Sequence, residues 1–99
     1  MIVRRDIPLA DQIVQASHAA LEAGFRFERP DETSHIVLLS ADDEQSLMLE
    51  RDRLEAVGIN CVLFHEPDEP INGWTALATR PITDTGERRL LRKQALWRP

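Results

Sequence analysis

The hydrophobic and polar positions at the start of the chain predict a strand followed by a helix. Residues 1–5, "MIVRR", contain β-branched residues in a short run typical of a strand. Residues 8–23 predict a helix, with Pro8 in the first turn and Gly24 just past its end. Apolar residues recur there at the spacing of one buried stripe: Leu9, Ile13, Ala16 and Ala20.

A polar stripe occupies the opposite side of this helix and consists of Asp11, Gln15, His18 and Glu22. At 100° per residue these positions fall within about 60° of one another. We therefore expect Gln15 and His18 to face together, away from the core. They would lie in solvent or line a cleft covered by another segment.

Three later apolar runs predict strands: residues 35–41 "HIVLLSA", 59–66 "INCVLFHE" and 74–82 "WTALATRPI". Residues 41–58 predict an acidic helix with Asp42 and Gln45 as a capping pair and Gly58 at its end. Residues 83–97 predict a closing helix, whose apolar side covers the sheet or forms a homodimer contact.

The predicted element order is β-α-β-α-β-β-α, an α/β fold in one domain over residues 1–99. We expect a mixed four-stranded sheet flanked by helices, with one antiparallel strand. Ligands usually bind such sheets outside the carboxyl ends of the strands. The loops expected there carry "RRDIP" and "HEPDEP".

The charge balance limits the classes of partner. A net charge of -5 argues against broad, sequence-independent binding of nucleic acid, although a local basic patch remains compatible with it. Lys93 is the only lysine among the 12 basic residues, and arginine binds phosphate in a two-pronged way that lysine cannot.

The sequence does not indicate a cysteine nucleophile, a metal or cofactor site, or a membrane span. Cys61 is a lone cysteine in an apolar run, where a buried small side chain is the expected role and a nucleophile is not. The three histidines lack metal-ligand spacing, and we expect neither a metal nor a cofactor. No apolar stretch is long enough for a membrane span, so we expect a cytoplasmic protein without membrane contact.

Candidate chemistry gathers at the expected carboxyl edge of the sheet. Arg5 and Asp6 follow the first strand, and the "HEPDEP" loop brings His65, Glu66 and Asp68 near the helix face with its histidine. A histidine near carboxylates, with an arginine to hold an anion, is a workable set for general base catalysis on an ester. It is also a common composition for surface loops.

These residues resemble the type II peptidyl-tRNA hydrolase family. The resemblance rests on "VRRD" at 3–6, "QASHAA" at 15–20 and the closing "TALATRP" at 75–81, and it runs from Ile2 to about Trp97. It implies a hydrolase that cleaves the ester between a peptide or N-blocked aminoacyl group and tRNA, and for this reaction we expect an activated water. The family has a lysine where this chain has Asp11, and "HEPDEP" replaces the family's Asp-Ala-Gly-Arg-Thr loop.

The resemblance matches four residues by position, Asp6, Gln15, His18 and Thr75, and the roles of these and of neighbouring residues are our hypothesis. His18 or Asp68 would activate the water, with Glu66 as the alternative to Asp68, while Gln15 and Thr75 would position the ester carbonyl or the terminal ribose. We expect a further set of residues to bind the substrate by contacting tRNA phosphate, sugar or base: Arg4, Arg5, Asp6, Arg26 and Trp74. An arginine would then supply the positive charge that Asp11 does not.

Two other functions fit the same residues. One is a non-catalytic relative that binds a nucleic-acid end, a nucleotide or a protein, which the acidic charge and Asp11 favour. The other is an esterase or amidase acting on a small conjugate unrelated to tRNA.

Overall fold

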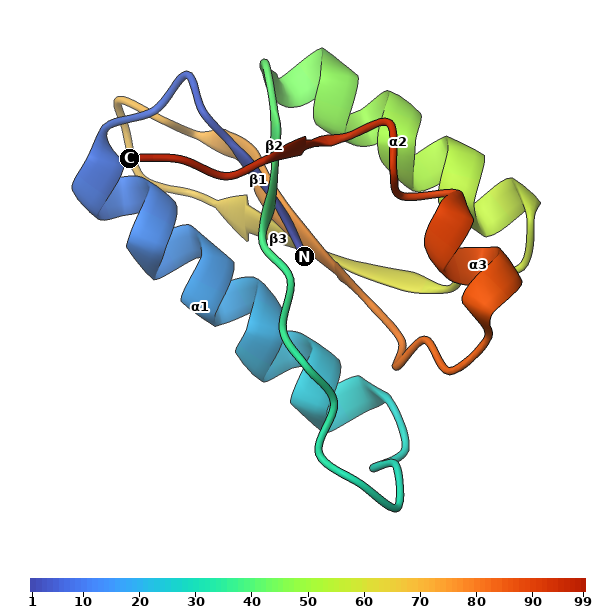
Figure 1. The fold of residues 1–99 in the computed structure, drawn as a ribbon. Helices are drawn as coiled ribbons and strands as arrows, with labels where there is room; N and C mark the ends of the chain where they lie inside the picture. The colour runs from blue at the N-terminus through green and yellow to red at the C-terminus, as the bar shows by residue number, and fades with distance from the viewer.

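A five-stranded mixed sheet forms the centre of the molecule (Figure 1). The computed structural model describes residues 1–99. The strands are β1 (Ile2–Arg4), β2 (Leu39–Ala41), β3 (Cys61–Glu66), β4 (Gly73–Thr79) and β5 (Ala95–Leu96), in the spatial order β3-β4-β1-β2-β5. With a radius of gyration of 12.8 Å, the chain is a compact single α/β domain.

Strand pairing confirms the mixed sheet and corrects its size. β1 pairs in parallel with β2 and antiparallel with β4, and β4 pairs antiparallel with β3. β5 adds a second antiparallel strand at the outer side of β2. The sheet therefore has five strands where four were predicted, because the end of the chain returns to the sheet as a strand.

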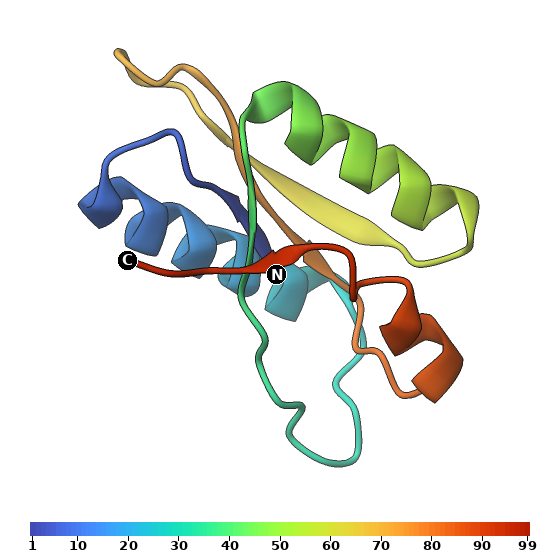
Figure 2. The same cartoon turned by 45° about the horizontal axis from the view of Figure 1, so that its top comes forward.

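Two helices cover opposite faces of this sheet, as Figures 1 and 2 both show. α1 (Leu9–Arg26) packs on the face that carries Val3, and α2 (Glu44–Ala56) packs on the face that carries Ile2. Neighbouring strand residues point to opposite faces, so these two adjacent side chains enter two separate core clusters. None of the helices combines the length and the apolar composition that crossing a membrane requires.

The side of α1 that faces the core differs from the prediction. The buried residues are Gln12, Gln15, Ala16 and Ala19, whereas Leu9 and Ile13 are 47% and 55% exposed. Small alanine side chains allow the helix to lie close to the strands. The two glutamines are buried because each finds hydrogen-bond partners there, which removes most of the cost of burying an amide.

The ends of the two long helices are set by local contacts. α1 continues through Gly24 to Arg26 and stops where Phe27 becomes extended. The side chain of Asp43, not that of Asp42, caps α2 by accepting a 2.8 Å hydrogen bond from the backbone N–H of Ser46. Gly58 lies two residues after the end of α2, and its φ of 85° suits a residue without a side chain.

The predicted closing helix is present only as one short turn, α3 (Thr85–Arg89). Leu90 and Leu91 then pack against the core cluster beneath α2, and β5 follows. The strand predicted over residues 35–41 is shorter as well, because its partner β1 is only three residues long. Ile36 and Val37 precede β2 and are exposed.

Candidate hydrolytic site

Three side chains from three elements meet at the carboxyl end of β3. Gln15 of α1 donates a 2.8 Å hydrogen bond from Nε2 to Oε2 of Glu66. The Thr75 hydroxyl of β4 lies 2.7 Å from Gln15 Oε1, to which it donates. We call this set the Gln15–Glu66–Thr75 network; it ties the first helix to the β3–β4 hairpin.

The orientation of the Gln15 amide follows from its partners. An ionised carboxylate only accepts hydrogen bonds, so the amide NH₂ faces Glu66 and the amide oxygen faces Thr75. Gln15 is 2% exposed and Thr75 is 0% exposed. Both side chains use their hydrogen bonds inside the protein and hold Glu66 in place, while their predicted role in positioning the ester carbonyl or the ribose stays a prediction.

A β-bulge points the Thr75 side chain toward α1. Phe64 pairs with Ala76 and His65 pairs with Trp74, which leaves Thr75 as an extra residue on β4. Strict alternation would place Thr75 and Ala76 on opposite faces of the sheet. The bulge instead lets both face α1, a use of bulges that is frequent beside functional sites.

Glu66 is held in its charged form. The hydrogen bond from Gln15 lowers the pKa of Glu66 most, and the backbone N–H of Asp68, 3.1 Å from Oε1, lowers it further. Nearby His18 and His65 act in the same direction. Each carboxylate oxygen therefore carries one hydrogen bond from the protein and has remaining capacity to hold a water molecule.

His18 lies flat against an aromatic ring at this site. Its imidazole stacks on Phe64, with ring centroids 4.3 Å apart and an interplanar angle of 5°. Phe64 is two residues before Glu66 on β3, so the two share the face toward α1. The stack fixes the plane of the imidazole, and His18 remains exposed at its edges.

A second cluster lies on the α2 side of the same edge. Arg4 donates from Nε and Nη2 to the two oxygens of Asp6, at 2.9 and 3.0 Å, and from Nη1 to the carbonyl of Trp74 at 3.1 Å. Glu44, at the start of α2, accepts a 2.7 Å hydrogen bond from the Trp74 N–H. Gly73 has no side chain, and the Glu44 carboxylate occupies the space that a Cβ atom would fill.

The remaining predicted residues are more dispersed. Trp74 is partly exposed and meets His65 edge to face, with centroids 4.9 Å apart. Asp68 is exposed in the β3–β4 loop and contacts Glu66 through its backbone N–H. Arg5 forms a 2.7 Å ion pair with Asp42. Arg26, eleven residues after Gln15 and so about 16 Å further along α1, donates to the Cys61 carbonyl instead.

Two residues at the site escaped the sequence prediction, namely Phe64 and Glu44. The period of two along β3 was a usable signal for Phe64, because it puts that ring on the same face as Glu66. No sequence signal marks Glu44, whose contact with Trp74 depends on how α2 docks. Cys61 is buried as predicted, and burial raises the pKa of its thiol to about 11.

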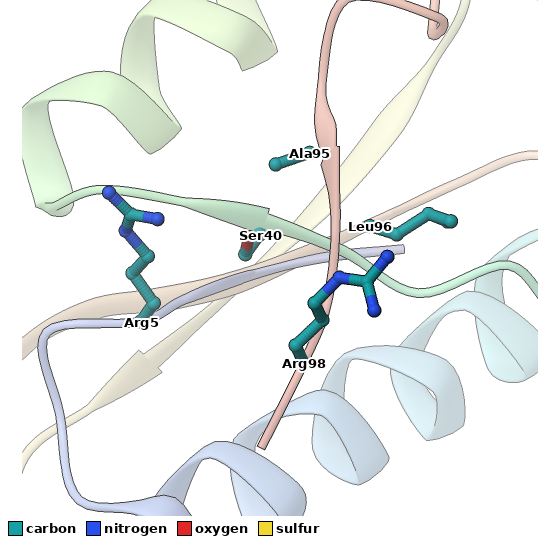
Figure 3. A pocket seen from close by; sticks show the side chains of 5 residues that line it. All are labelled: Arg5, Ser40, Ala95, Leu96 and Arg98. Carbon is teal, nitrogen blue, oxygen red and sulfur yellow. The ribbon is translucent and has the colours of Figure 1, made fainter.

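The network lies at an open edge of the sheet, and none of its three side chains lines either of two hollows in the surface. One hollow, of about 370 Å³, is lined by Arg5, Ser40, Ala95, Leu96 and Arg98 (Figure 3). A wider groove of about 1220 Å³ lies along residues 27–37 and includes Arg29, His35 and Arg80. No group of three or more His, Cys, Asp or Glu side chains is arranged to hold a metal ion.

The chain matches no protein-family model and no curated protein sequence at a significant level. The geometry above is therefore the basis for a functional proposal.

Proposed function

We propose that this protein hydrolyses the ester between a peptide, or an N-blocked aminoacyl group, and the 3′ end of tRNA, as the resemblance to type II peptidyl-tRNA hydrolases implies. The Gln15–Glu66–Thr75 network beside a stacked His18 is the observation that carries the proposal. It supplies an ionised carboxylate and an exposed imidazole at one open edge. A macromolecular substrate can reach such an edge without an enclosed pocket.

In the proposed reaction, water attacks the ester carbonyl carbon. Glu66 orients this water through its free lone pairs, and His18 accepts the proton that the water releases. The bond from the carbonyl carbon to the ribose oxygen breaks, and His18 passes the proton it accepted to that oxygen, which leaves as a hydroxyl group. Aligning the water with a reactive ester accounts for part of the rate, because positioning alone lowers the activation barrier.

Substrate contacts in this proposal come from the loops around the network. The exposed ring of Trp74 is the candidate platform for a terminal base, since aromatic side chains commonly stack on unpaired nucleotides. Arg5 is the candidate phosphate contact after β1, because its pair with Asp42 is exposed and so contributes little to stability. Arg4 shapes the edge because it pairs with Asp6 and donates to the Trp74 carbonyl.

A single-turnover assay on an N-acetylaminoacyl-tRNA tests the proposal. We expect the wild type to release the acyl group and His18→Ala to lose about 10²-fold or more of the rate, the usual contribution of a general base. His35→Ala is the matched control, because His35 is exposed on the segment before β2, away from the network, and its loss should leave the rate unchanged.

Asp11→Lys probes the position where the family has lysine. A positive charge there favours an anionic substrate, so the rate should rise if the substrate passes this part of α1. A folded wild type that releases no acyl group would contradict the proposal, as would equal rates in His18→Ala and the wild type.

A second candidate function is a binding module without catalysis, and the charge pairing at the edge favours it. Arg4 and Arg5 are both paired with carboxylates, so part of the positive charge at this edge is already neutralised within the protein. A salt titration of tRNA binding separates the cases in part, because several phosphate contacts make affinity fall steeply with salt. A flat dependence, with no ester cleavage, would point to a protein or uncharged ligand.

A further inference from the structure

The α1-facing side of β2 is left uncovered by the helices. α1 packs against β1, β3 and β4 but not against β2. Leu39 and Ala41 point into the cluster beneath α2, so the residue between them, Ser40, points to the α1 side. The hollow of about 370 Å³ lies at this position and is beside the start of the first helix (Figure 3).

The Ser40 hydroxyl opens onto this hollow. Ser40 is 8% exposed and lines the hollow, and its hydroxyl takes part in none of the hydrogen bonds within the protein. No fully buried side-chain nitrogen or oxygen in the molecule lacks a partner. The hydroxyl therefore reaches the surface of the hollow, where it is available to a ligand as donor or acceptor.

Two arginines line the hollow together with Ser40. Figure 3 shows Ser40 between Arg5, from the loop after β1, and Arg98, from the segment after β5. Arg98 has no ion-pair partner. Arg5 is paired with Asp42 through Nη2, but both side chains are well exposed, at 60% and 69%, so an anion with more charge can compete for the arginine.

We propose that Arg5, Ser40 and Arg98 bind one phosphate group. A carboxylate has two oxygens, and a single guanidinium group can bind both of them. A phosphate has more oxygens, so it can accept hydrogen bonds from three donors on three different segments. Ala95 and Leu96 of β5 give the hollow an apolar wall suited to a sugar or base next to the phosphate.

The phosphate has two sources with the same chemistry: a backbone phosphodiester of a nucleic acid, or the monoester of a small phosphorylated ligand. This site does not depend on the ester chemistry proposed above, since phosphate binding is measured without any cleavable bond. If this protein binds phosphate here but cleaves no ester, the result would support the phosphate site and contradict the proposed hydrolase activity.

An NMR titration of the full chain with inorganic phosphate tests the inference. We expect saturable shifts of the backbone amides of residues 5, 40 and 98 that sodium chloride at matched ionic strength does not produce. Arg98→Gln and Ser40→Ala should each weaken binding several-fold or more. Arg89→Gln, which removes an exposed arginine of α3 that does not line the hollow, should bind as the wild type does.

Two further probes distinguish the sources. If the trinucleotide CpCpA without a terminal phosphate binds more tightly than adenosine 5′-monophosphate, the phosphate source is a nucleic-acid backbone. If adenosine 5′-monophosphate binds more tightly than CpCpA, the source is a small phosphorylated ligand. Either result supports the site. Absence of saturation with all three probes would overturn it. Equal weakening by Arg98→Gln and Arg89→Gln would also overturn it, because the effect would then be a general one of charge.

Discussion

A single glutamine connects helix, strand and carboxylate at the proposed site. Gln15 lies almost wholly inside the protein, where both ends of its amide are used: one by the Thr75 hydroxyl and one by Glu66. Buried amides are costly without partners, so each member of this network depends on the others. The network thus fixes where Glu66 stands at the edge of the sheet.

Thr75→Val tests the buried part of the network. Valine has nearly the same shape but cannot donate to Gln15 Oε1, so we expect a loss of about 1–3 kcal/mol in the free energy of unfolding. Urea denaturation measures this loss. Thr83→Val is the control, because Thr83 is exposed and should change stability by less than about 0.5 kcal/mol. Equal effects of the two substitutions would rule out a stabilising network.

Glu66 predicts a dependence of stability on pH. Its pKa is lower in the folded than in the unfolded protein, so its ionised form stabilises the fold at pH values above the ordinary glutamate pKa of about 4.3. This contribution is lost as the pH falls through the lowered pKa. The gap in melting temperature between the wild type and Glu66→Gln should therefore be widest near pH 7 and narrow toward pH 3. A gap of the same size at both pH values would contradict a lowered pKa of Glu66 in the folded protein.

At the scale of elements, α1 shows why apolar spacing alone does not decide which face of a helix is buried. Leu9 and Ile13 of the predicted stripe are largely exposed, while its Ala16 is buried. Ala19 and two glutamines complete the face that meets the sheet. Three strands of the sheet contact the helix, and their apolar side chains already fill the interface. Small helix residues fit against such a surface better than large ones do.

Ile13→Ala separates the observed helix face from the one that the apolar spacing favours. Because Ile13 is more than half exposed, the substitution should change the free energy of unfolding by no more than about 0.5 kcal/mol. Ile59→Ala, at a fully buried isoleucine, should cost about 2–5 kcal/mol. Chemical denaturation of the two variants gives both values. A cost for Ile13→Ala near that of Ile59→Ala would place Ile13 in the core.

At the scale of the whole molecule, the last ten residues tie the two layers together. Gln94 donates a 2.7 Å hydrogen bond to Glu50 of α2, and the Trp97 indole donates a 2.7 Å hydrogen bond to Gln12 of α1. β5 lies between these two contacts and pairs with β2 (Figure 2). The same segment supplies Arg98 to the proposed phosphate site, so its docking and that site are coupled.

Trp97→Phe should loosen this attachment. Phenylalanine keeps most of the ring but leaves the Gln12 amide oxygen, in a residue only 8% exposed, without its donor. We expect a loss of about 1–3 kcal/mol in urea denaturation. Trp74→Phe provides the matched comparison, because the Trp74 indole N–H has no partner within the protein and its removal should cost less than about 0.5 kcal/mol. A loss no larger than that in Trp97→Phe would show that the hydrogen bond from Trp97 to Gln12 does not help to hold the segment.

The local sequence determined the order of the first six elements and their approximate positions. Apolar runs such as "NCVLF" in β3 and the acidic start of α2 act within a few residues, so they are readable without knowledge of neighbours. It also placed His18, Glu66 and Thr75 among the residues of interest. These predictions depend on periodicity, capping and the resemblance of "QASHAA", all of which are properties of contiguous sequence.

Only the tertiary structure decided how those residues meet. The burial of Gln15, the bulge at Thr75, the return of the chain as β5 and the convergence of Arg5, Ser40 and Arg98 all depend on partners far apart in the sequence. Their energies arise from packing and from satisfying buried polar groups, which depend on the whole arrangement and not on any one segment.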